Sequence, residues 1–246
     1  MSSPIPRAAL VAAFFLALTL WSGGADAGSF QVNPIRVDMA GGTTNAAITV
    51  RNDGADPVVV QLSVLGWTQE ADRDAYGATT EALVTPPIAT IAPGAEQIVR
   101  VGLRRAPDAQ RELAYRLFVQ EVPSPPKPGF TGLQVALRVG LPVFVAPLAP
   151  VARQLEWSAT LRADGTIRLA LSNKGNTHIK IADFELRTDA RGEPVAREAQ
   201  LAYVLAGQRR EWVFPAAGDR VGVAAELHIK AISDAGEIQA AVKLDR

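Results

Sequence analysis

Hydrophobic and polar residues alternate along residues 133–145, which read Leu-Gln-Val-Ala-Leu-Arg-Val-Gly-Leu-Pro-Val-Phe-Val. Every second residue is a leucine or a valine, which is the periodicity of one face of a β-strand. Strands usually contain about five or six residues, so a single domain core does not need an apolar face of this length. We therefore expect a long strand whose apolar face packs against another chain. The simpler alternative is that this face only lines the core of one sandwich.

The rest of the chain also predicts short strands separated by turns. Besides residues 133–145, the predicted strands are 46–50, 58–65, 86–91, 96–103, 111–122, 155–161, 166–171, 179–186, 198–205, 210–214, 223–232 and 238–244. No long segment combines a 3.6-residue period with helix caps, so we expect little helix. Short strands at this spacing are typical of β-sandwiches. The predicted fold class is all-β, with two sandwiches joined near residues 147–150.

The first 27 residues have the features of a secretory signal peptide. A short polar start with Arg7 precedes an apolar run over residues 8–21, and Ala25-Asp26-Ala27 supplies a cleavage pattern. The apolar run is shorter than the roughly 20 residues that cross a bilayer. We expect export without membrane insertion after cleavage. The predicted domains are residues 1–27 (signal peptide), 28–148 (N-terminal domain) and 149–246 (C-terminal domain).

Composition narrows the function classes. The chain has no cysteine, so neither disulfides nor thiol chemistry are available. Its 25 basic residues balance its 25 acidic residues, which disfavours a nucleic-acid partner. Residues 72–77 resemble the start of a calcium loop but lack its later ligands, so we expect a solvated loop there. His178 and His228 stand in no metal-type spacing, and we expect no metal or other cofactor. Trp67, Trp157 and Trp212 are interpreted as core aromatics of the sandwiches.

Several segments, in order behind the signal peptide, resemble the PapD-like family of periplasmic pilus chaperones. They are residues 30–39 (FQVNPIRVDM), 48–53 (ITVRND), 86–101 (PPIATIAPGAEQIVRV), 116–123 (RLFVQEVP), 133–145, 172–181 (SNKGNTHIKI) and 203–214 (YVLAGQRREWVF). The short loop over residues 123–131 is similar to the corresponding loop of the family's short-loop members. The resemblance implies two immunoglobulin-like domains in an L shape.

The same resemblance implies a function and a site. Such chaperones work in the periplasm, bind pilus subunits by donor-strand complementation and deliver them to an outer-membrane usher, without enzymatic activity. Leu133, Val135 and Leu137 match the family's donor residues, and Val139 extends the set. In the free protein this apolar edge is exposed. One expected state is therefore a dimer in which each copy covers the apolar edge of the other.

A basic pair grips the subunit's C-terminal carboxylate in this family. Arg36 matches the first member of the pair, and a guanidinium can hold a carboxylate through two hydrogen bonds. Pro142 stands where the family has its lysine, and proline carries no charge and no backbone N–H. This departure points to a divergent branch such as the archaic chaperone-usher class. It leaves the second basic residue unassigned.

Two other function classes fit a secreted β-sandwich. A structural or adhesive module would be expected to show repeats or a polymerising extension, and neither is visible in the sequence. A carbohydrate enzyme would need two carboxylates that converge across a cleft. The acidic residues here are scattered through turns, so the chaperone interpretation is favoured.

Overall fold

The computed structural model describes residues 30–40, 42–70, 73–125, 133–190, 192–199, 201–215, 221 and 224–246. The secondary-structure elements that they form are β-strands. The predicted signal peptide, and most of the stretch that resembles the short-loop members, lie outside the described residues. Within the described part, no helix has the length and apolarity needed to cross a membrane.

The first ten strands precede residue 146. They are β1 (Phe30–Asn33), β2 (Val37–Met39), β3 (Asn45–Asn52), β4 (Val58–Glu70), β5 (Arg73–Ala78), β6 (Ala82–Thr85), β7 (Ile88–Ile91), β8 (Glu96–Leu103), β9 (Leu113–Glu121) and β10 (Arg138–Val145). One sheet has the order β1-β3-β8-β6, and the other has the order β2-β10-β9-β4-β5 with β7 also paired to β4. Alternate residues of both sheets, such as Val50, Val99, Leu117 and Val143, form one buried core.

The remaining strands form a second body. They are β11 (Leu155–Leu161), β12 (Thr166–Asn173), β13 (Ile179–Arg187), β14 (Ala196–Glu198), β15 (Ala202–Val204), β16 (Arg209–Pro215), β17 (Glu226–Ser233) and β18 (Gly236–Asp245). Their order is β14-β13-β17-β18-β11-β12-β16, with β15 paired to β13. The sheet folds over where β11 and β18 run parallel. It thereby closes a separate core that includes Leu169, Leu186 and Ile229.

Apart from shifts in where strands begin and end, the strands differ from the sequence prediction in four places. The family resemblance implies one first strand over residues 30–39, but these residues form two strands, because the chain passes from the first sheet to the second between Asn33 and Val37. A solvated loop was predicted at residues 72–77, but from residue 73 to residue 78 the chain pairs with β4 as strand β5. Strand β6 was not predicted, and the predicted strand 198–205 is divided between β14 and β15. These pieces are short, so their strand character comes from their pairing partners rather than from a pattern of their own.

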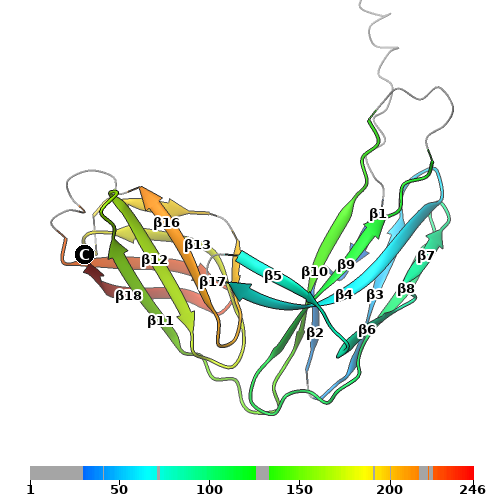
Figure 1. Ribbon diagram of the computed structural model, residues 1–246, viewed down its shortest axis with the longest axis horizontal. Coiled ribbons are helices and arrows are strands. Elements are labelled where there is room, and N and C mark those ends of the chain that lie inside the picture. The colour runs from blue at the N-terminus through cyan, green and yellow to red at the C-terminus, as the bar shows by residue number, and fades with distance from the viewer. Residues whose placement is uncertain are drawn as a thin grey trace, which may run out of the picture.

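The two sandwiches are set at an angle to each other, as the expected L shape requires (Figure 1). The β4–β5 hairpin extends from the first sandwich to the second and bridges the bend. Asp74 on β5 accepts a hydrogen bond at 3.2 Å from Arg210 on β16. Residues from both bodies therefore line the space inside the bend.

Candidate functional site

The long alternating segment serves two purposes along its length. Strand β10 begins only at Arg138, so the predicted strand 133–145 is too long at its N-terminal end. Leu141, Val143 and Val145 on one face are buried in the first sandwich, and Leu137 and Val139 pack partly against the same core.

The same apolar face continues beyond the end of the sheet. Leu133 is 87% exposed and Val135 is 68% exposed. Figure 1 shows this green segment running past the end of β10. The face that fills the core at one end is therefore uncovered at the other.

Hydrogen bonds hold this overhanging segment (residues 133–137) beside the chain that leaves β9. The backbone N–H of Glu121 donates to the carbonyl oxygen of Leu137 at 2.8 Å, and the Leu137 N–H donates to the Glu121 carboxylate at 3.2 Å. Gln134 donates from its amide to the Ser124 carbonyl oxygen at 2.8 Å. The segment is thus extended and tethered on one side only.

The opposite edge of β10 is open. In an antiparallel pair, backbone groups of alternate residues point to the same neighbour. Because Leu137 bonds to Glu121 of β9, the even-numbered residues Arg138, Gly140 and Pro142 direct their backbone groups away from β9. On that side β2 pairs with β10 only from Val143 onward. Within the described residues, the edge before Val143 has no partner strand.

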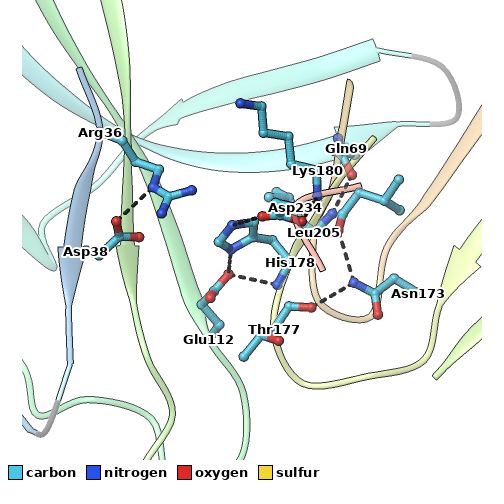
Figure 2. Close-up of polar contacts among 11 residues, drawn as sticks. Arg36, Asp38, Gln69, Glu112, Asn173, Thr177, His178, Lys180, Leu205 and Asp234 are labelled. Carbon is cyan, nitrogen blue, oxygen red and sulfur yellow. Dashed lines mark hydrogen bonds and ion pairs between the residues drawn. The ribbon is translucent and has the colours of Figure 1, made fainter. Parts of the chain in front are cut away.

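Arg36 lies in the short connection between β1 and β2, on the side of the first sandwich that faces the second. Its Nε donates to an Asp38 carboxylate oxygen at 2.7 Å. Figure 2 shows the guanidinium pointing toward the residues that the second sandwich contributes, among them His178 and Asp234. The arginine is partly exposed, so it remains accessible from inside the bend.

An aromatic cluster joins the two sandwiches. Trp67 on β4, Phe144 on β10 and Leu205 after β15 are buried together. The His178 ring stacks on Phe144 with a centroid distance of 3.6 Å, and Tyr203 meets Trp67 edge-on at 5.4 Å. Trp67 was expected in a sandwich core. The structure places it in this joint, because the second half of β4 lies against the second sandwich.

Polar contacts lock the same joint (Figure 2). The His178 Nδ1 is 2.7 Å from a Glu112 carboxylate oxygen, which also accepts the His178 backbone N–H at 3.0 Å. Both side chains are nearly buried, at 11% and 6% exposure. Gln69 donates to the Tyr203 carbonyl oxygen at 2.7 Å and accepts the Leu205 N–H at 2.9 Å. These contacts cross between the sandwiches, so they fix the angle at which the two bodies meet.

Two arginines lie on the face of the β10–β9–β4 sheet that turns toward the bend. The Arg116 guanidinium carbon lies 4.9 Å from the centroid of the Trp67 ring, and that of Arg138 lies 4.1 Å from the Phe118 ring. Gly140 makes room for them, because a Cβ there would approach Arg116 Nε to 3.1 Å and a Phe118 ring carbon to 3.0 Å. The result is a layer of rings and cations beside the open edge of β10.

The described residues offer little for metal or acid–base chemistry. Among them, no group of three histidine or carboxylate side chains is placed to hold a metal ion. The Glu81 carboxylate accepts the Tyr115 hydroxyl at 2.9 Å and an Arg105 N–H at 2.6 Å, and these two hydrogen bonds lower the pKa of Glu81. That carboxylate is engaged in holding the fold.

The fold and this site define a class of protein. Residues 29–150 match the family model of the pili and flagellar-assembly chaperones, PapD N-terminal domain, and the chain belongs to this family. The family's role is that of a chaperone.

Relatives of known name and structure agree with this assignment. The chaperone protein FimB/FhaD of Bordetella pertussis is 29% identical over 126 residues. That match covers 48% of this chain and 51% of the relative, so the chain spans about half the length of the curated relative that it matches.

Solved structures show the same two-domain immunoglobulin-like fold. The CsuC–CsuE chaperone–tip adhesion subunit complex from archaic chaperone-usher Csu pili of Acinetobacter baumannii contains a chain with a TM-score of 0.66 and 21% identity, over 89% of this chain and 100% of that chain. The Escherichia coli chaperone DraB has a TM-score of 0.59 and 23% identity, over 87% and 97% of the two chains. A chain of the Salmonella enterica SafA pilin–SafB chaperone complex has a TM-score of 0.59 and 19% identity, over 88% and 98%.

Sequence reasoning did not find the joint or the layer of cations. Glu112 and His178 are separated by 66 residues, and nothing in either local sequence indicates that they meet. Arg116 lies within an apolar strand pattern, and nothing in that pattern indicates a functional role for the arginine.

Proposed function

We propose that this protein is a periplasmic chaperone that binds pilus subunits by donor-strand complementation and delivers them to an outer-membrane usher. The observation that carries the proposal is the apolar face that leaves the first core and continues, uncovered, through Val135 and Leu133. An uncovered strand edge with apolar side chains is a template for pairing with another chain. The proposal involves no catalytic step.

In this proposal, a subunit strand pairs with the open edge of β10 and the subunit core receives the apolar face. Leu133 and Val135 enter that core first, followed by Leu137 and Val139. Burying the first two side chains stabilises the complex by roughly 3–6 kcal/mol, at about 1.5–3 kcal/mol each. Leu137 and Val139 add less, because they already pack partly against the first sandwich. Association costs then remove much of this gain.

Arg36 is the proposed anchor for the subunit's terminal carboxylate. Its position inside the bend, beside Asp38 and facing the second sandwich, supports this role. A guanidinium binds a carboxylate through two parallel hydrogen bonds, which fixes orientation as well as contributing energy. Donor face and anchor together would set the register of the subunit on β10.

The test is co-expression with candidate pilus subunits in a bacterial periplasm, followed by pull-down. We expect the wild-type chain to recover a soluble complex. Val135→Asp and Leu137→Asp should reduce recovery at least about tenfold, because each places a charge in an apolar groove. Secretion of the cleaved chain into the periplasmic fraction checks the proposed location.

The matched control lies on the opposite face of the same segment. Ala136→Asp introduces the same charge at an exposed position that points away from the donor face. It should retain the complex. Equal recovery from all three variants, or equal loss from all three while they remain folded, would reject the donor face.

A further inference from the structure

His178 lies at the joint between two carboxylates, one from each sandwich. Its Nδ1 is 2.7 Å from a carboxylate oxygen of Glu112, which directly precedes β9 in the first sandwich. Its Nε2 is 3.8 Å from a carboxylate oxygen of Asp234, in the turn between β17 and β18 of the second sandwich. Figure 2 shows the imidazole ring between these two side chains. The histidine thus connects an acid of the first body with an acid of the second.

Only the protonated ring suits both of these contacts. A neutral imidazole has one N–H and one lone pair, so in either tautomer one of the two carboxylates faces a lone pair. The imidazolium has an N–H on both nitrogens and places a positive charge between two negative ones. The Asp234 carboxylate is also held in place, because it accepts the backbone N–H of Lys180 at 3.0 Å. The geometry of the joint therefore favours the charged form of His178.

Other charged and titratable groups approach the ring from neighbouring elements. The Tyr203 ring on β15 lies 5.6 Å from the imidazole, centroid to centroid. Burial raises the pKa of the Tyr203 hydroxyl, and the positive charges of Arg36 and Arg116 oppose that rise. Lys180 on β13 is drawn on the same side of the joint (Figure 2). Among the described residues, however, the recorded polar contacts of the two ring nitrogens are with the two carboxylates.

His178 also acts on the strand that carries the donor face. Its ring is stacked on Phe144 of β10, with a centroid distance of 3.6 Å and an interplanar angle of 13°. A cation over an aromatic face gains an attraction that a neutral ring lacks. Phe144 is buried, and its neighbours Val143 and Val145 belong to the first core. A change at the imidazole is therefore transmitted to the relative position of β10 and the second sandwich.

We propose that His178 is a positioning residue whose protonation fixes the second sandwich against β10. The protonated ring holds Glu112 and Asp234 together across the joint. After loss of the proton, a ring lone pair or the Glu112 contact is left unsatisfied, and the two bodies adopt a wider range of angles. An imidazole changes its charge between about pH 5 and pH 8, so the fixed angle is expected at the acidic end and is lost toward the alkaline end.

The consequence for partner binding rests on the proposed function. Subunit capture needs the donor face and the second sandwich in one arrangement, and apparent affinity falls with the population of that arrangement. Because a hydrogen bond to a charged group contributes more than a neutral one, we expect capture to be about fivefold weaker at the alkaline end. The angle itself can be measured without any subunit.

The experiment measures the bend in the free secreted chain. Because the chain has no cysteine, Ala47→Cys and Ser158→Cys place one spin label on an exposed position of each sandwich. Double electron–electron resonance gives the distribution of distances between the labels at about pH 5.5 and about pH 8. We expect a narrow distribution at the lower pH and a broader one at the higher pH. Titration of the imidazole Cε1–H resonances by NMR, over the same range, should follow the broadening.

Three variants assign the response to the joint. His178→Gln keeps a neutral donor but cannot become charged, so its distributions at the two pH values should coincide. Glu112→Gln removes one of the two negative charges and should reduce the response. His228→Gln is the matched control, since it removes the chain's other histidine, which lies on β17 beside Glu226, and it should respond as wild type does. Thermal midpoints report whether each variant folds.

Identical distributions at both pH values in the wild-type chain overturn the inference. A response that survives unchanged in His178→Gln or Glu112→Gln, or that disappears in His228→Gln, also overturns it. The proposed function has its own readout in subunit capture and the Val135→Asp variant. A chain that captures subunits through the donor face without any change of the bend with pH keeps the function and loses the role of His178.

Discussion

Asn52 organises the end of a strand in the first sandwich. It is fully buried at the end of β3. Its amide donates to the carbonyl oxygens of Asp56 and Ile91 at 2.8 and 2.9 Å, and its side-chain oxygen accepts the Gly54 N–H at 2.9 Å. One side chain therefore supplies three hydrogen bonds to backbone groups that would otherwise be buried without partners.

Asn173 repeats this arrangement at the end of β12. Its amide donates to the carbonyl oxygen of Thr177 (Figure 2) and to that of Val204, and its oxygen accepts the Gly175 N–H. Replacing it by alanine should destabilise the second sandwich by roughly 2–4 kcal/mol, because several backbone groups lose their partners in a buried site. Thermal unfolding of Asn173→Ala beside wild type measures the effect.

The control is Asn45→Ala, which removes an exposed amide from β3 and should change stability by less than about 0.5 kcal/mol. If both variants unfold at the wild-type temperature, the hydrogen bonds of Asn173 contribute nothing measurable.

Because of Glu81, the stability of the folded protein should depend on pH. Hydrogen bonds from Tyr115 and Arg105 lower the pKa of Glu81 in the folded state below its ordinary value of 4.5. The stability that these hydrogen bonds to Glu81 contribute is therefore complete above pH 4.5, and it is lost as the pH falls through the pKa of Glu81 in the folded state. We expect the thermal midpoint of Glu81→Gln to lie below that of wild type at neutral pH and to approach it on acidification. A constant gap at all pH values would contradict this linkage.

At the scale of elements, β4 changes its buried face midway. Val60 and Leu62, at even positions, point into the first core, whereas Trp67 and Gln69, at odd positions, are buried against the second sandwich. A strand whose buried parity switches has no uniform alternation. For this reason the sequence pattern predicted only residues 58–65, and the half that reaches the joint was missed.

The β4–β5 hairpin should couple the unfolding of the two sandwiches. Gln69 forms two cross-domain hydrogen bonds, to Tyr203 and Leu205, and also donates to Asp74 at 2.9 Å. Gln69→Ala removes these contacts and leaves the Leu205 N–H buried. We expect calorimetry to show either two separated transitions or a joint transition weakened by about 2–3 kcal/mol.

A matched control for this variant is Gln61→Ala, which changes an exposed glutamine nearer the start of β4, away from the joint. It should leave the calorimetric profile as in wild type. If Gln69→Ala also unfolds with an unchanged profile, the hairpin does not couple the domains.

At the scale of the whole molecule, local patterns predicted the all-β class and both sandwiches, because alternation in a strand follows from burial of one face. They did not predict what the bend contains. Glu112 with His178, and Gln69 with Leu205, meet only when two finished domains pack. Residues 73–78 have no apolar alternation and become a strand only through β4. Contacts of this kind depend on tertiary structure, which no short window of sequence contains.

The joint positions the parts of the proposed site relative to one another. Phe144 on β10 stacks with His178 of the second sandwich, so the strand that carries the donor face is also packed into the bend. The orientation of the second sandwich, which places Tyr203 against Trp67, is thereby tied to the strand that would receive a partner.

The division of one apolar face between core and overhang has an evolutionary consequence. Leu137 and Val139 contribute to the first core as well as to the proposed donor face, so mutations there are selected for stability and for binding at once. Leu133 and Val135 touch little within the chain and are free to vary with the partner. Descendants of this sequence should therefore diversify first at positions 133 and 135, acquiring new partners without loss of their own fold.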